Sequence, residues 1–105
     1  MDLEYLRTVA TPACERFGVR RLHVFGSVAR GDEGPESDVD LLVELEHPEL
    51  RPSKRFLGLL HYLEDHLERP VDLLTASSLT NPYLRRRVLR ERVPVYERRD
   101  PEVAL

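Results

Sequence analysis

The stretch that decides the fold is residues 21–45, which read RLHVFGSVARGDEGPESDVDLLVEL. Each end of this stretch is a short, mainly apolar run, which is typical of a buried β-strand. We therefore expect strands at about 21–26 and 38–45. Gly26-Ser27 lies where the first strand turns toward a short helix. The glycines and proline of 31–37 then predict a loop that leads into the second strand.

Asp38 and Asp40 stand two residues apart at the head of the second strand. Because side chains alternate along a strand, both carboxylates project from one face, while Val39, Leu41 and Val43 point to a core on the other. Two like charges this close disfavour each other unless a cation compensates, and Mg²⁺ is commonly held by carboxylates together with substrate phosphates. An Asp-x-Asp pair alone is also common at solvated strand ends, so the neighbouring residues are needed to distinguish a metal site from such an end.

Gly26 and Ser27 supply that context. Glycine allows a tight turn and the close approach of a ligand, and the first turn of a helix leaves its amide N–H groups without partners. Such a junction suits a phosphate group, to which the Ser27 hydroxyl adds a donor and Arg30 a cationic clamp. The alternative is an ordinary helix cap followed by a surface arginine.

Taken in order, these segments resemble the defining motif of the minimal nucleotidyltransferases, the smallest branch of the DNA polymerase β superfamily. The motif residues are Gly26-Ser27-Val28-Ala29-Arg30-Gly31, a short acidic loop, and Ser37-Asp38-Val39-Asp40-Leu41-Leu42-Val43. The likeness continues through residues 69–75 and 88–97, so it covers roughly residues 3 to 97.

The resemblance implies transfer of a nucleoside monophosphate, AMP from ATP, onto a hydroxyl group with the help of two Mg²⁺ ions. Gly26, Ser27 and Arg30 would hold the triphosphate. The carboxylates that the motif assigns to metal binding and catalysis are Asp38, Asp40 and Asp72. The last of these is a single acid in the apolar run 71–74, and its alternative is an edge-strand residue that faces water.

Such minimal proteins commonly act beside a HEPN-domain protein, a small all-α ribonuclease toxin, and serve as its antitoxin by adenylylating a tyrosine. The resemblance therefore implies a HEPN-domain partner and a protein acceptor. Two other classes stay open: a non-catalytic nucleotide-binding antitoxin that acts by direct contact, and a transferase that acts on RNA or on a small molecule.

Composition favours a small enzyme. The chain has 105 residues, and size scaling leaves room for one core, so we expect a single nucleotidyltransferase domain over residues 1–105. Cys14 is the only cysteine, no apolar run reaches membrane length, and residues 1–4 lack the features of a secretion signal. We therefore expect a cytoplasmic protein that does not associate with membranes.

Charge is unevenly spread along the chain. The net charge of −3 argues against general affinity for nucleic acid, and for the same reason weakens the RNA alternative. Five arginines nevertheless cluster near the end, at positions 85, 86, 87, 90 and 92. They form either a solvated helix face or a contact surface for a partner or RNA. The oligomeric state is left open.

Outside the motif, hydrophobic spacing predicts a first helix that ends at Gly18, and Pro12 is expected to kink it or to restart it with Thr11 as N-cap. Ser53 is expected to cap a second long helix, and Asn81-Pro82 to start a last one. Further strands are expected at about 70–75 and 93–97, the latter at an edge because of Pro94. The fold class is α/β: a small mixed sheet of three to four strands flanked by helices, as in polymerase β-like nucleotidyltransferases.

Overall fold

The computed structural model describes residues 1–98, and its centre is one four-stranded sheet in the order β3-β2-β1-β4. The strands are β1 (Val19–Phe25), β2 (Val39–Leu45), β3 (Val71–Thr75) and β4 (Val93–Glu97). β1 runs antiparallel to both of its neighbours, β2 and β4, whereas β2 and β3 are parallel. The mixed sheet predicted from the sequence is confirmed, and β4 lies at an edge as Pro94 requires.

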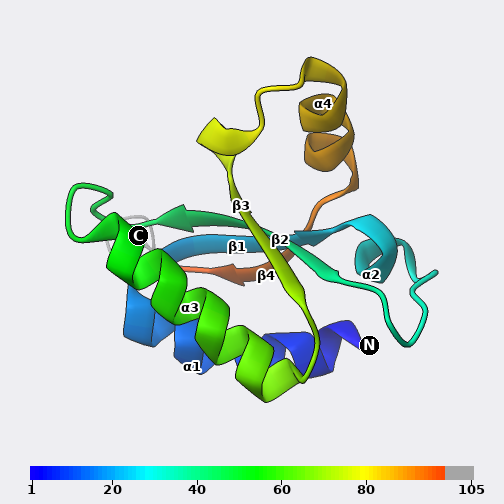
Figure 1. Ribbon diagram of the computed structural model, residues 1–105, viewed down its shortest axis with the longest axis horizontal. Helices are drawn as coiled ribbons and strands as arrows, with labels where there is room; N and C mark the ends of the chain where they lie inside the picture. The colour runs from blue at the N-terminus through cyan, green and yellow to red at the C-terminus, as the bar shows by residue number, and fades with distance from the viewer. Residues whose placement is uncertain (99–105) are drawn as a thin grey trace, which may run out of the picture.

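Two long helices, α1 (Leu3–Phe17) and α3 (Pro52–Leu67), pack side by side against one face of the sheet (Figure 1). The short helix α2 (Gly26–Arg30) continues directly from β1. A turn of 3₁₀-helix, η1 (Ala76–Ser78), and α4 (Pro82–Glu91) rise on the other side of the sheet. None of the helices described is both long and apolar enough to cross a lipid bilayer.

Alternation along the strands gives the sheet two different faces. On β2, Val39, Leu41 and Val43 are buried beneath α1 and α3, where they join leucines of both helices in the main core. Burying one such side chain stabilises the fold by about 1.5 to 3 kcal/mol, so this face supplies most of the stability. Asp40 and Glu44 point to the opposite face, which we call the open face.

A second, small core holds α4 and η1 over the open face. It consists of four buried side chains, Phe25, Leu42, Leu79 and Val88, with Leu74 packed against them. This small core thus joins α4 and the segment after η1 to β1 and β2, on the side of the sheet opposite α1 and α3 (Figure 1).

The N-terminal helix differs from one part of the sequence prediction, the restart at Pro12 with Thr11 as N-cap. α1 is a single helix that continues through Pro12, and Thr11 does not act as an N-cap but donates its hydroxyl hydrogen to the carbonyl of Arg7 at 2.7 Å. Pro12 lies on the exposed side, whereas Ala10 and Ala13 are fully buried. Packing of the inner face therefore outweighs the hydrogen bond that proline removes.

Of the other predictions for helix ends, two are confirmed and one is wrong. Gly18 ends α1 in the left-handed conformation (φ 67°), and the Asn81 side chain accepts from two amides of α4, both as expected. Ser53 does not cap α3, which begins one residue earlier at Pro52, after Arg51. Proline at the first helical position needs no amide donor and is already set to the helical φ, so it takes over the start of this helix.

Arg55 ties together the side of the molecule at which α1 ends, β2 ends and α3 begins. Its guanidinium donates to five backbone carbonyls, at 2.5 to 3.0 Å: those of Phe17, Gly18, Glu46, His47 and Leu50. All five guanidinium N–H groups thus have partners, in a geometry that a lysine ammonium cannot reproduce.

We therefore expect Arg55→Lys to lower the free energy of unfolding by about 2 to 4 kcal/mol, because several carbonyls lose a charge-assisted donor at once. Urea denaturation measures the change, with Arg86→Lys on the exposed side of α4 as the matched control, expected within about 0.5 kcal/mol of the parent. Equal losses in the two variants would contradict the role given to Arg55.

Candidate active site

Two of the three predicted carboxylates meet on the open face through strand register. Asp40 on β2 pairs directly with Asp72 on the parallel strand β3. Neighbouring strands lie about 4.8 Å apart, and residues in register project from the same face. Asp38 comes just before β2 and is exposed, as is Asp72. The structure thus brings together acids that are separated by more than thirty residues of sequence.

Asp40 is the half-buried member of this group, and its pKa is raised. Burial raises the pKa of the Asp40 carboxyl above its usual range, and the negative charges of Asp72 and Asp38 raise it further, while Arg30 acts in the opposite direction. Each of these acids is therefore close enough to Asp40 to disfavour its ionised form. A site of this kind favours binding of a cation.

Gly26 lies directly against the Asp40 carboxylate. Phe25 is the strand partner of Asp40, so the chain turns into α2 immediately beside it. Gly26 has a φ of 70°, and a Cβ placed there would lie 2.2 Å from Oδ2 of Asp40. Only glycine meets both demands, a left-handed backbone and a missing side chain. The predicted phosphate-binding turn and the predicted metal-binding acids are therefore in contact.

Ser27 is half-buried at the start of α2. The residue before this helix, Phe25, offers no side-chain cap to the amide groups of the first turn. The first turn of α2 lies beside the Asp40 carboxylate, because α2 begins at the glycine that touches Asp40. The arrangement can receive a phosphate next to a cation.

Arg30 lies near the acids but already has carboxylate partners. Its Nε donates to Asp32 at 3.2 Å and one Nη to Glu91 of α4 at 3.1 Å. The hydrogen bond to Asp32 is the main reason that the pKa of Arg30 is raised. The sequence did not anticipate this bridge between α2 and α4, since 61 residues separate Arg30 from Glu91. The clamp on phosphate oxygens stays a prediction, and it requires Arg30 to exchange one of these partners.

Two interactions hold the loop that precedes Asp38. Ser37 accepts the amide hydrogen of Gly34 at 2.8 Å, which closes a turn within the loop. Glu33 forms an ion pair with Arg69, just before β3, and their side chains are only 11% and 22% exposed. This pair joins the segment that precedes Asp38 to the segment that precedes Asp72. Sequence reasoning missed it, because nothing in either local pattern signals a pairing over 36 residues.

The chemistry of the three acids fits a hard divalent cation, since all donors are carboxylate oxygens and the charges of Asp72 and Asp38 add to the raised pKa of Asp40. Within residues 1–98, no three His, Cys, Asp or Glu side chains already converge as a complete metal-binding group.

Two alanine substitutions test the contact between Gly26 and Asp40. Gly31 also has a positive φ, 78°, but a Cβ there would meet nothing within 4 Å, so Gly31→Ala introduces only backbone strain, about 1 to 2 kcal/mol. Gly26→Ala adds a clash with the carboxylate, and we expect a clearly larger loss in urea denaturation. Equal losses would show that the Asp40 contact does not constrain this turn.

Comparison with known proteins matches the part of the chain that contains these site residues. The model of the nucleotidyltransferase domain family matches residues 6–95. The protein adenylyltransferase MntA of Thermococcus cleftensis is 47% identical over 81 residues, which cover 77% of this chain and 79% of that protein.

Solved structures agree with this match. One described as a "putative minimal nucleotidyltransferase" superimposes with a TM-score of 0.74 at 42% identity, covering 90% of this chain and 96% of the other. A tri-AMPylated Shewanella oneidensis HEPN toxin in complex with its MNT antitoxin gives a TM-score of 0.61 at 16% identity, over 92% of this chain and 74% of the other, which shows a shared fold alone. Because the family model spans most of its length and the Thermococcus relative is this similar, the chain belongs to the nucleotidyltransferase domain family, in the branch of the minimal nucleotidyltransferases.

Proposed function

We propose that this enzyme transfers AMP from ATP to a hydroxyl group of a partner protein, in a reaction that depends on Mg²⁺. The observation that supports the proposal is the contact of Gly26 with Asp40, because the turn at Gly26 then lies beside a carboxylate that is in register with Asp72. A nucleoside triphosphate is the substrate that needs both within a few ångströms.

The chain's own residues have distinct tasks in this proposal. Amide groups at the Gly26-Ser27 turn and the Ser27 hydroxyl orient the β and γ phosphates. The ligands proposed for Mg²⁺ are Asp38, Asp40 and Asp72. When bound, two Mg²⁺ ions supply charge stabilisation at the attacking and leaving oxygens of the displacement.

The reaction exchanges one phosphorus–oxygen bond for another. The acceptor oxygen forms a bond to the α-phosphorus, the bond from that phosphorus to the bridging oxygen breaks, and pyrophosphate leaves with the electron pair. Asp72, which is exposed on the open face, is proposed to help remove the proton of the acceptor hydroxyl.

The proposed acceptor is a tyrosine of a HEPN-domain toxin, for which this protein would serve as antitoxin. Two comparisons support the idea: the Thermococcus relative is named a protein adenylyltransferase, and a structure of the same fold contains an AMPylated HEPN toxin. Transfer to a protein also suits a small domain whose acceptor comes from outside. ATP and Mg²⁺ are plentiful in the cytoplasm, the location that the sequence predicts.

Asp40→Asn should abolish transfer and at the same time stabilise the metal-free protein at neutral pH. The raised pKa of Asp40 means that its ionised form opposes folding, so the native residue is least favourable above that pKa and the disadvantage fades as pH falls through it. The gain from asparagine should therefore shrink in acid. Labelled ATP, Mg²⁺ and a HEPN-domain protein measure transfer, and thermal melts at several pH values measure stability.

The matched control is Asp65→Asn, an exposed position on α3 that should change neither property. Near-normal transfer by a well-folded Asp40→Asn protein would refute the metal-binding role. Binding and inhibition of the HEPN-domain protein without any transfer by the parent enzyme would instead favour the contact-only antitoxin.

Ser27→Ala should weaken binding of a non-hydrolysable ATP analogue by about 1 to 3 kcal/mol, the usual range for a hydrogen bond to a charged group. Arg30→Ala should do the same if Arg30 leaves Glu91 or Asp32 to reach the phosphates. Calorimetric titration measures both, with Ser53→Ala on the exposed start of α3 as the control. Unchanged affinity in the two site variants would leave both residues with structural roles only.

A further inference from the structure

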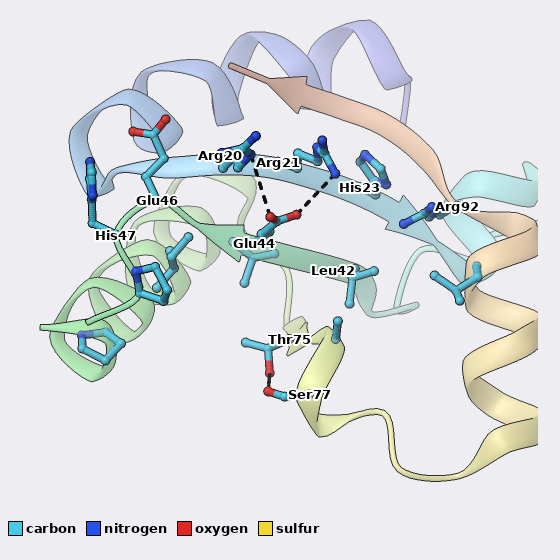
Figure 2. Close-up of a pocket in the computed structure, with 16 residues that line it drawn as sticks. Arg20, Arg21, His23, Leu42, Glu44, Glu46, His47, Thr75, Ser77 and Arg92 are labelled. Carbon is cyan, nitrogen blue, oxygen red and sulfur yellow. Dashed lines mark hydrogen bonds and ion pairs between the residues drawn. The ribbon is translucent and has the colours of Figure 1, made fainter. Parts of the chain in front are cut away.

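The open face carries a cavity of about 620 Å³ that is lined by none of the proposed active-site residues. Its floor is the part of β1 and β2 that lies toward Glu44, and its walls come from the residues after β2 and from η1 and α4 (Figure 2). We call it the open-face groove. Asp40, Leu42 and Glu44 share one face of β2, but Leu42 belongs to the small core with Val88. That core stands between the groove and the catalytic acids, so the groove is a separate site.

Cationic side chains border the groove on two sides. Arg20 and Arg21, on β1, share one carboxylate, that of Glu44, at 3.9 and 3.6 Å (Figure 2). Arg92, at the end of α4, has no ion-pair partner among the residues that the structure describes. The other carboxylate that lines the groove, Glu46, pairs with Arg98. The border therefore has more positive than negative charge, although the protein as a whole is acidic.

Apolar side chains lie between these charges. Leu42, Pro48 and Pro52 line the groove, and Leu89 of α4 lines it while remaining 40% exposed. Leu50 is exposed in the same segment as the two prolines. An apolar floor between arginines matches a chain that presents leucine or aromatic side chains together with carboxylates.

We propose that the open-face groove is a docking site for an acidic segment of the partner protein that carries the acceptor hydroxyl. The identity of the partner as an acceptor rests on the proposed function, whereas binding of the segment does not. Docking at a distance from the catalytic acids would hold the partner while its hydroxyl approaches Asp40. It would also explain how a domain of this size selects a protein substrate.

The first experiment measures binding alone, by fluorescence anisotropy. The probes are a labelled, capped peptide with a central tyrosine flanked by leucines and glutamates, and a matched peptide with lysines in place of the glutamates. We expect the acidic peptide to bind preferentially and more weakly as salt rises. Arg92→Glu and Leu89→Asp should each weaken it about tenfold or more, while Arg16→Glu, the same charge change on α1, should leave its affinity unchanged.

The second experiment measures transfer to a HEPN-domain protein. Arg92→Glu should raise the KM for the protein acceptor and leave both kcat and the affinity for the ATP analogue unchanged, since the groove is apart from the carboxylates. Transfer by the parent enzyme with an unaltered KM in the variant would overturn the docking site while leaving the proposed function intact. Absence of transfer by the parent would refute the function, and the peptide measurements would still decide the groove.

Three binding results would overturn the proposal. They are equal affinity of the parent and Arg92→Glu proteins for the acidic peptide, tighter binding of a single-stranded oligonucleotide than of that peptide, and loss of ATP affinity in Arg92→Glu. The last two would assign the groove to nucleic acid or to the nucleotide. Circular dichroism of each variant establishes that it is folded, and because Arg92 and Leu89 are both exposed we expect native spectra.

Discussion

The antiparallel register of β1 and β2 is the constraint on which the site depends. Because Phe25 pairs with Asp40, the chain leaves the sheet at Gly26 with its backbone pressed against the Asp40 carboxylate. A slip of one residue would turn the acids of β2 into the main core and move the turn away from them. The hydrophobic alternation of β2 and the missing side chain at Gly26 therefore secure the same register from opposite faces of the sheet.

The two faces of the sheet have different roles: one supplies most of the stability, and the other carries the candidate active site. α1 and α3 bury one face. Arg55 donates hydrogen bonds to the carbonyls of Phe17 and Gly18 and so connects the end of α1 to the start of α3. The open face instead gathers carboxylates that repel one another, an arrangement that costs stability in the absence of a cation. Polar chemistry of this kind is tolerated because the opposite face contributes enough buried apolar surface to hold the strands.

α4 links the parts of the molecule that face solvent. It rests on the small core, and its last turn reaches α2 through the ion pair of Glu91 with Arg30. Arg30 is therefore shared between the neighbourhood of Asp40 and the helix that borders the open-face groove. The ion pair of Arg30 with Glu91 therefore joins the segment beside Asp40 to the last turn of α4.

The sequence by itself determined the local features: the apolar periodicity that sets the strands and helices, the Gly18 and Asn81 caps, and the spacing of Gly26, Asp38 and Asp40 within one motif. These are readable because hydrophobic alternation and helix capping act over a few residues. For the same reason the sequence misjudged Thr11 and Ser53 as N-caps, because packing of an inner helix face and a proline start outweighed local capping preference.

Only the tertiary structure decided which distant residues meet. The pairing of Asp72 with Asp40 follows from parallel register between β2 and β3, and the ion pairs of Glu33 with Arg69 and of Arg30 with Glu91 join segments 36 and 61 residues apart. The open-face groove is likewise lined by residues of β1, β2, η1 and α4, which are distant in sequence. Such contacts depend on how whole helices and strands pack. The sequence around a charged side chain is the same whether that side chain contacts solvent or a residue on another strand, so it does not reveal the partner.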